Sequence, residues 1–171
     1  SLTVVQGNVM NSQHVADVLK GQEAVIQTLG YNGKGSGKPT TFTTDATRII
    51  IQGMKENNVQ RLIAMSVVGA GNSISFLPGI FTKVLMPIFM KWFVYIIGDK
   101  NTMEPLITNS GLNWTIVRSI TIKDKAATGR THATLDGRNL KFSITVGDVA
   151  NFLAEQLTDQ TFSKQTPVIS N

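Results

Sequence analysis

The sequence predicts an α/β fold, with a doubly wound parallel sheet and helices on both of its faces. Short apolar runs alternate with helix-like stretches of about 10–15 residues, the pattern of successive βαβ units. The runs at residues 24–26, 62–65 and 114–117 are almost wholly apolar, as is typical of strands buried on both faces. The length of 171 residues suits one domain, so we expect residues 1–171 to form a single domain.

Charge and reactive side chains narrow the classes of function. The 16 Lys and Arg against 11 Asp and Glu give a net charge of +5, which suits an anionic small ligand. The basic residues are scattered, so we expect no nucleic-acid partner. The chain has no cysteine and only two histidines, His14 and His132, which excludes disulfides and thiolate catalysis and predicts no metal site.

The first strand and helix are predicted at the start of the chain. The apolar run at residues 2–5 predicts a short strand. Asn11 or Ser12 can cap the helix that follows, because a short polar side chain accepts hydrogen bonds from the first turn. Gly21 is expected to end this helix. Its apolar positions recur at helical spacing: Val15, Val18 and Leu19.

A second strand and helix flank a loop rich in glycine and lysine. The strand is expected at residues 24–29 and the loop at residues 31–40. The helix is expected to begin at Thr43 or Thr44. It should end at residues 57–58, because Asn tolerates the left-handed backbone that often follows a helix.

The loop at residues 33–38 is similar to a phosphate-binding P-loop only in composition. Asn32 stands where that motif requires glycine, and Pro39 stands where Ser or Thr would bind magnesium. We therefore expect a lysine-bearing loop, in which Lys34 or Lys38 could still meet a phosphate.

The second half of the chain continues the alternation. The buried strand at residues 62–65 ends at Ser66. A helix is expected through residues 103–107, stopping near Gly111, and the strand at residues 114–117 follows it.

The C-terminal part predicts shorter elements. One or two short strands are expected within residues 131–144, around a turn at residues 136–137. Thr145 and Asp148 resemble a capping box, with Asp in place of Glu, at the start of a further helix. Residues 167–169 predict the last strand.

The predicted sheet places a ligand site at one edge, because ligands of open parallel sheets bind beyond the carboxyl ends of the strands. Four groups stand just after apolar runs: residues 7–9, 29–31, 66–68 and 118–120.

These groups, in this order, resemble the atypical short-chain dehydrogenases/reductases, in particular the NmrA-like NAD(P)H-binding family and the flavin reductase (biliverdin-IXβ reductase) type. The matching segments span nearly the whole chain: residues 4–9, 21–26, 29–30, 53–55, 59–62, 65–66, 110–118, 128–129, 134–138 and 144–150. The resemblance implies a Rossmann-like sheet.

The resemblance also implies that the first βαβ unit of the family is absent from this sequence. The family opens with a strand and a G-x-x-G-x-x-G turn that holds the pyrophosphate, and no such turn occurs here. The chain would begin at the family's third strand, with roughly 40 residues missing. We expect a fragment rather than a truncated member of the family.

By resemblance, the cofactor is NADP or NAD, with NADP preferred, and the site residues follow from the matched motifs. Asn8 takes the place of an Asp that accepts from the adenine amino group, and Val9 would lie against the ring. Contacts to ribose and pyrophosphate are implied for Leu29, Gly30 and Tyr31. The segment beside the nicotinamide is Arg118, Ser119, Ile120 and Thr121, with Ser119 in place of the family's proline. Plain turns and loops after strands are the alternative interpretation of these positions.

Two residues are catalytic candidates, Ser66 and Lys100. The Ser66 hydroxyl could orient the nicotinamide or donate to a substrate carbonyl, whereas small residues also commonly end buried strands. Lys100 could bind ribose or an acidic substrate, or be a solvated lysine. The usual Y-x-x-x-K pair is absent: Ile96 stands four residues before Lys100, and Tyr95 stands five before, about 140° away around a helix.

Residues 76–97 are unusually apolar. Spanning a membrane would take about 20 apolar residues, but prolines and lysines interrupt this run at positions 78, 83, 87 and 91. We expect a wall or lid over a substrate pocket, or an interface of a homo-oligomer, rather than membrane contact. The segment could also be ordinary core.

These observations together favour a cytoplasmic NAD(P)H-dependent reductase of a flavin-like, quinone-like or other flat apolar small-molecule acceptor. Without a Tyr–Lys pair, a reaction whose acceptor takes its proton from solvent suits the site. The alternative is a non-catalytic NAD(P)-binding redox-sensing regulator of the NmrA-like type. A third hypothesis is a chain that binds no dinucleotide and acts through residues 76–97.

Overall fold

The computed structural model describes residues 2–31 and 37–171, so that Lys34 of the predicted loop lies outside the described residues. The elements of the N-terminal half are α1 Ser12–Leu19, β1 Ala24–Gln27, α2 Phe42–Glu56, β2 Arg61–Val67 and a 3₁₀ turn at Gly71–Phe76. A π-helical turn at Phe81–Leu85, α3 Met86–Phe89, α4 Lys91–Thr108 and β3 Asn113–Ser119 follow. The chain ends with β4 Thr121–Lys123, β5 His132–Thr134, β6 Ser143–Thr145, α5 Val146–Glu155 and β7 Val168–Ser170.

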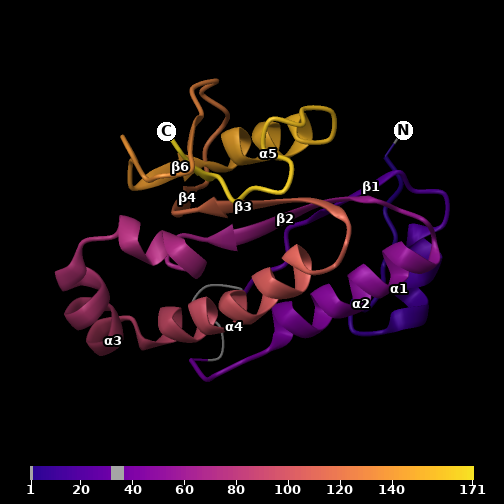
Figure 1. Ribbon diagram of the computed structural model, residues 1–171, viewed down its shortest axis with the longest axis horizontal. Helices are drawn as coiled ribbons and strands as arrows, with labels where there is room; N and C mark the ends of the chain where they lie inside the picture. The colour runs from indigo at the N-terminus through magenta and orange to yellow at the C-terminus, as the bar shows by residue number, and fades with distance from the viewer. Residues whose placement is uncertain (1, 32–36) are drawn as a thin grey trace.

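The main sheet has the strand order β1-β2-β3-β7-β5. The first four strands are parallel, and β5 runs antiparallel to β7. Helices α1, α2 and α4 cover one face, and α5 covers the other (Figure 1). A small parallel pair, β4 and β6, lies beside the main sheet. The predicted doubly wound α/β fold is therefore confirmed.

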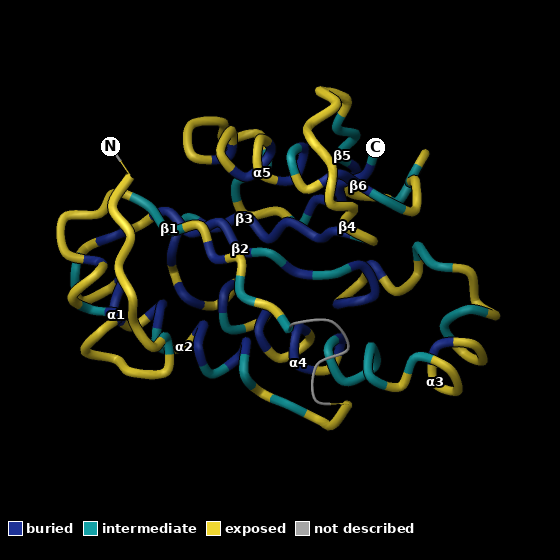
Figure 2. Tube along the Cα trace, turned by 180° about the vertical axis from the view of Figure 1, so that it is seen from behind, coloured by how far each residue is buried: buried dark blue, intermediate teal, exposed yellow. Residues whose placement is uncertain are grey.

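Alternation along β2 divides the core into two layers, because successive side chains of a strand point to opposite faces. Leu62 and Ala64 pack with the helices α1, α2 and α4, whereas Ile63 packs with α5. All three side chains are fully buried, which explains why the run is apolar throughout (Figure 2).

Several helix ends lie where the sequence predicts them. The Asn11 side chain accepts from the backbone N–H groups of Gln13 and His14 and caps α1. Asn58 adopts a φ of 59° directly after α2 and its C-cap, as expected for the predicted end at residues 57–58. Thr145 caps α5 by accepting from the backbone N–H of Asp148.

Two predicted elements are wrong in extent or kind. Residues 2–5 form no strand, and Leu2 and Val4 are 91% and 86% exposed. A strand needs a hydrogen-bonded neighbour, and none of the described residues pairs with this segment. Helix α4 begins at Lys91 rather than near residue 103, and Pro105 lies inside it.

The apolar segment at residues 76–97 is not ordinary core, because many of its large side chains are exposed. Among the helices of the described residues, none taken alone has the length and the apolar composition of a membrane span. One bent pair, Phe81–Phe89 with Lys91–Thr108, satisfies length and composition together, at a bend of 114°.

Replacing Ile116 by alanine tests the position of the core. Ile116 lies in β3 with no exposed surface, so Ile116→Ala should lower the free energy of unfolding by about 2–5 kcal/mol. Ile122 in β4 is 44% exposed, so the control Ile122→Ala should cost less than about 1 kcal/mol. Urea denaturation of both variants measures the difference, and equal losses would contradict the assigned layers.

Candidate functional site

The ends of β2 and β3 bring two predicted site residues together. The register of these parallel strands pairs Ser66 with Arg118. Ser66 lies two residues after Ala64 in β2, so its side chain is on the same face as Leu62 and Ala64. Arg118 is paired with Ser66 in the neighbouring strand and shares that face. They therefore point toward α4.

Glu104 of α4 binds both of these side chains. Arg118 forms a bidentate ion pair with it, at 2.7 Å from Nη2 to Oε2 and 3.0 Å from Nε to Oε1. The Ser66 hydroxyl donates to Oε1 at 2.7 Å. Arg118 and Glu104 are buried, with side-chain exposures of 3% and 7%. Both charges are thus removed from water, a cost that only a close and well-aligned pair can offset.

The segment after β2 closes over this ion pair. The Asn72 side chain accepts from Arg118 Nη1 at 2.7 Å. Gly71 has a φ of +52°, and a Cβ there would lie 2.5 Å from Arg118 Nη2. Its backbone N–H donates to Asn101 of α4 at 2.7 Å. Glycine is thus required at position 71 for the loop to approach the guanidinium.

Lys100 lies one helical turn before Glu104 and links the ends of β1 and β2. Its Nζ donates to the carbonyl oxygens of Leu29 and Met65, at 3.1 Å each, and lies 3.6 Å from the sulfur of Met103. Burial lowers the pKa of Lys100 to about 8, although the nearby carboxylates of Asp99 and Glu104 act in the opposite direction.

Asp99 attaches the start of α2 to α4. Its carboxylate accepts from the backbone N–H groups of Thr43 and Thr44, at 2.8 and 3.0 Å, and from both of their hydroxyls. It therefore caps α2 from another element. Burial alone would raise the pKa of Asp99, but the hydrogen bonds from Thr44, Tyr31 and Thr43 outweigh it and lower the pKa.

Tyr31 is held in the same network. Its hydroxyl donates to Asp99 at 2.5 Å and lies 2.7 Å from the hydroxyl oxygen of Thr40. Burial, together with the hydrogen bond to Asp99, raises the pKa of Tyr31 to about 12. At neutral pH this phenol is therefore a firmly held neutral group.

The structure thus gathers five of the predicted residues around one helix. They are Leu29, Tyr31, Ser66, Lys100 and Arg118. Ser119 is buried at the end of β3 and, as the neighbour of Arg118 in the strand, points to the opposite face of the sheet. Gly30 is exposed, and a Cβ built there would meet no atom within 4 Å.

Other predicted residues lie outside this network. Asn8 is exposed, and its side chain accepts from the backbone N–H of Met10 at 2.9 Å in a local turn. Val9 packs, partly buried, against the same core cluster as Leu29. Ile120 is partly buried, and Thr121 is exposed in β4, where it pairs with β6. Their contacts with a dinucleotide remain predictions.

The sequence analysis missed the residues of α4 that hold the site together, Asp99 and Glu104. The signal that could have found them is helical periodicity. The buried positions of α4 are Ile97, Asp99, Lys100, Met103, Glu104 and Ile107. Charged residues at core positions of a helix indicate buried partners, but the predicted helix began too late for this pattern to appear.

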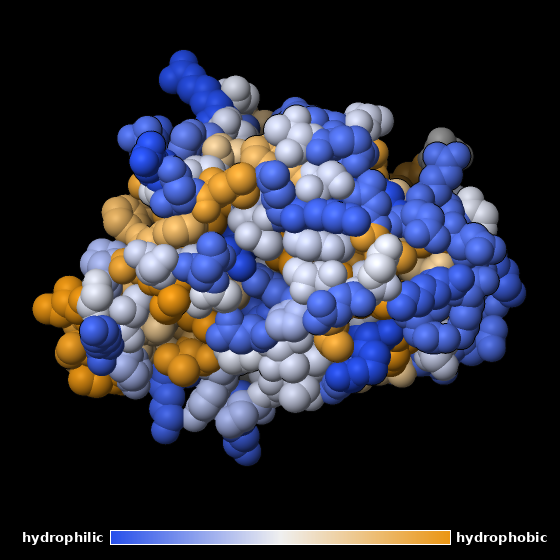
Figure 3. All heavy atoms as spheres, viewed as in Figure 1, coloured by the Kyte–Doolittle hydropathy of each residue, from blue (hydrophilic) through white to orange (hydrophobic). Residues whose placement is uncertain are grey.

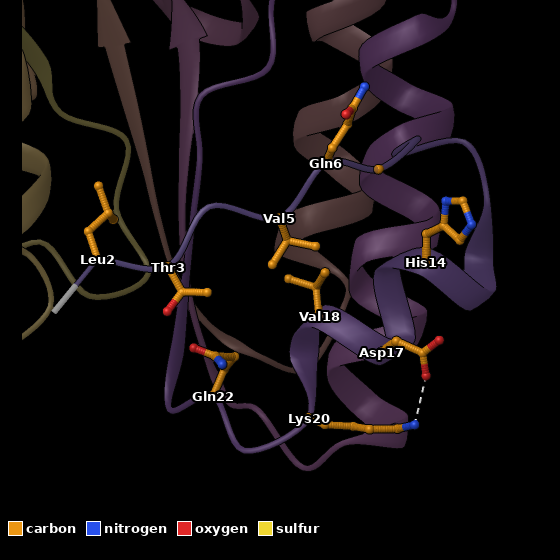
Figure 4. Close-up of a pocket in the computed structure, with 10 residues that line it drawn as sticks. Leu2, Thr3, Val5, Gln6, His14, Asp17, Val18, Lys20 and Gln22 are labelled. Carbon is orange, nitrogen blue, oxygen red and sulfur yellow. Dashed lines mark hydrogen bonds and ion pairs between the residues drawn. The ribbon is translucent and has the colours of Figure 1, made fainter.

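A hollow of about 720 Å³ lies elsewhere on the molecule, between the N-terminal segment, α1 and the turn before β1 (Figure 4). Figure 4 shows Val5 facing Val18, with the Asp17–Lys20 ion pair at the rim. Gly7, of the predicted group at residues 7–9, lines it, but none of the residues predicted to contact the cofactor does. The candidate site is therefore the carboxyl edge of the sheet and not this hollow.

Comparison with known families identifies the family to which the chain belongs. The NAD(P)H-binding family profile matches residues 1–160. This chain belongs to the NAD(P)H-binding family. The predicted resemblance and the Rossmann-like fold are both confirmed.

Solved structures share the fold at low sequence identity. ChuY, an anaerobillin reductase from Escherichia coli, superposes with a TM-score of 0.74 at 20% identity, over 95% of this chain and 72% of that chain. A short-chain dehydrogenase/reductase from Veillonella parvula in complex with NADP gives 0.72 at 17% identity, over 99% and 72%. The oxidoreductase ylbE from Lactococcus lactis gives 0.73 at 20%, over 98% and 70%.

The depressed pKa of Lys100 predicts a specific pH dependence of stability. The unfolded chain, with an ordinary lysine pKa of 10.5, binds more protons than the folded protein between about pH 8 and 10.5. The free energy of unfolding should therefore rise with pH in this window, by up to about 1.4 kcal/mol per pH unit, relative to Lys100→Met. Urea denaturation at several pH values measures this. Parallel curves for the parent protein and the variant would contradict a buried, charged Lys100.

The buried ion pair predicts non-additive losses. Glu104→Leu leaves Arg118 buried without its partner and should lower the free energy of unfolding by about 3–5 kcal/mol. The double variant Glu104→Leu with Arg118→Leu should lose less than Glu104→Leu alone, because no unpaired charge remains. Denaturation of the two single variants and the double variant measures the coupling. A double variant that loses the sum of both single changes would show that the two side chains act independently.

Proposed function

We propose that the protein is an NAD(P)H-dependent reductase that passes a hydride to a flat apolar acceptor of the flavin or quinone type. The observation that carries the proposal is the convergence of three strand ends on α4. Leu29, Ser66 and Arg118 follow or end different strands, and one helix holds all three. This is the edge at which open α/β sheets bind their ligands.

The residues at this edge suit a nicotinamide dinucleotide. Nothing in the described chain fills the space beside Gly30, so a ligand could approach its backbone closely. Lys100 fixes the carbonyls of Leu29 and Met65 and so sets the spacing of the strand ends against which the ligand would lie. When bound, the reduced nicotinamide would supply the hydride.

The site offers little for proton transfer to an acceptor. The Tyr31 hydroxyl is committed to Asp99, and its pKa of about 12 makes it a weak acid. The Ser66 hydroxyl donates to Glu104, so its oxygen remains able only to accept while that bond is made. This favours acceptors such as oxidised flavins or quinones, whose reduced forms take their proton from solvent after the hydride arrives.

The structural neighbours support the same class. One is named an anaerobillin reductase, and another is in complex with NADP. We therefore propose NADP as the preferred cofactor.

A second function, a non-catalytic NAD(P)-binding redox sensor, is favoured by the same Glu104 contacts. They occupy Ser66 and Arg118, two polar side chains that could act on a substrate. A protein that only binds the dinucleotide needs no free acid at this edge.

Turnover and binding measured together separate the two functions. The parent protein is incubated with NADPH or NADH and FMN or menadione, and the absorbance of the reduced nicotinamide is followed. A reductase gives acceptor-dependent oxidation, and faster oxidation of NADPH than of NADH supports the cofactor preference. Dinucleotide binding without turnover would support the sensor, and no binding would overturn both.

The variant Ser66→Ala tests whether the Ser66 hydroxyl contributes to the reaction. If the hydroxyl orients the nicotinamide, kcat should fall about tenfold while the dissociation constant for the dinucleotide changes little. Ser12→Ala, at the exposed start of α1, is the matched control and should leave both unchanged. Equal turnover in Ser66→Ala and the parent protein would exclude that role.

A further inference from the structure

We propose that residues 80–91, here called the apolar tip, dock on an anionic lipid surface. The tip contains the π-helical turn, α3 and the first residue of α4. This inference goes beyond the proposed reductase function and does not depend on it, because it concerns where the protein binds rather than what it reduces. It also differs from the expectation, drawn from the sequence, that this segment makes no membrane contact.

The tip exposes a concentration of large apolar side chains. Ile80, Ile88 and Phe89 are 70%, 65% and 74% exposed, and Val84 and Leu85 are about half exposed. Figure 3 shows hydrophobic atoms gathered at the end of the molecule where Figure 1 places α3. Single exposed apolar residues are common, but a contiguous group of this kind marks an interaction surface.

The charges on the tip have one sign. Its two charged residues, Lys83 and Lys91, are both exposed, and neither makes an ion pair within the described part of the chain. Residues 57–98 contain no Asp or Glu at all. Apolar side chains flanked by free lysines match the interface of an anionic bilayer, where the apolar groups insert shallowly and the cations meet headgroups.

Buried residues within the tip and in the helix that follows it attach the tip to the rest of the fold. Met86 is 6% exposed and anchors α3. More than two turns into α4, Asp99 is buried against the start of α2 and Lys100 against strand ends. A bend of 114° separates the tip's helical part from α4, and Ile88 and Phe89 are exposed at this bend. A tip attached in this way can insert without unfolding the site beneath it.

A second copy of the chain fits the tip less well. A two-fold symmetric contact would place Lys83 and Lys91 of one copy against the same lysines of the other, with no carboxylate in the tip to neutralise them. Anionic lipid supplies the missing charge.

The test is sedimentation of the whole protein with vesicles of phosphatidylcholine, with and without an equal amount of phosphatidylglycerol. The protein should sediment with the anionic vesicles, and binding should weaken as salt is added. Phe89→Ser should weaken it more than tenfold. Lys83→Gln and Lys91→Gln should each weaken it about fivefold. Phe142→Ser, a control at a residue 71% exposed in the loop before β6, should bind as the parent protein does.

Three outcomes would overturn the proposal. They are no sedimentation with anionic vesicles, equal sedimentation with phosphatidylcholine alone, and equal losses in Phe89→Ser and Phe142→Ser. A concentration-dependent dimer that Phe89→Ser abolishes, in the absence of vesicle binding, would assign the tip to a second copy instead. Circular dichroism of each variant shows that the fold is retained, which these exposed positions should permit.

Discussion

The arrangement of the sheet edge depends on three ionisable side chains buried on one face of α4. Asp99 caps α2, Lys100 binds the carbonyls that follow β1 and lie in β2, and Glu104 binds Arg118 of β3. Burying charges away from water is costly unless each finds partners, so each position constrains its neighbours closely. Helix α4 therefore fixes the relative positions of the ends of β1, β2 and β3 and of the start of α2.

These contacts with α4 also determine which groups at the site are available for chemistry. The hydroxyl groups of Tyr31 and Ser66, which could otherwise transfer protons, both donate hydrogen bonds to carboxylates of α4. A ligand at this edge would therefore meet mainly backbone groups. It would have room beside Gly30 and would lie against strand ends whose spacing is fixed. Such a site is suited to holding two planar partners in register, since positioning alone can contribute much of the rate of a hydride transfer.

The fold could be predicted from the sequence because its central strands are apolar runs and two of its helices are capped by residues close to them. Asn11 and Thr145 are such local signals, and both caps form. The strand predicted at residues 2–5 fails because a strand also requires a neighbour, which no local pattern specifies. The cap of α2 illustrates the same limit: its donor groups bind Asp99, which lies far along the chain.

The candidate site could be predicted only in part for the same reason. Position after an apolar run locates Ser66 and Arg118 at the carboxyl edge, and their pairing follows from the register. That Glu104 joins them depends on the helix that packs over the strands. The sequence around Glu104 does not show which side chains this carboxylate will contact, because its partners come from other elements that meet it only in the packed fold.

The most direct test of the account is a crystal structure of the protein with NADP bound. The account predicts the nicotinamide ring at the carboxyl edge, against the backbone of Gly30 and within hydrogen-bonding distance of Ser66. A dinucleotide bound in the hollow along α1, with no contact to either residue, would contradict it.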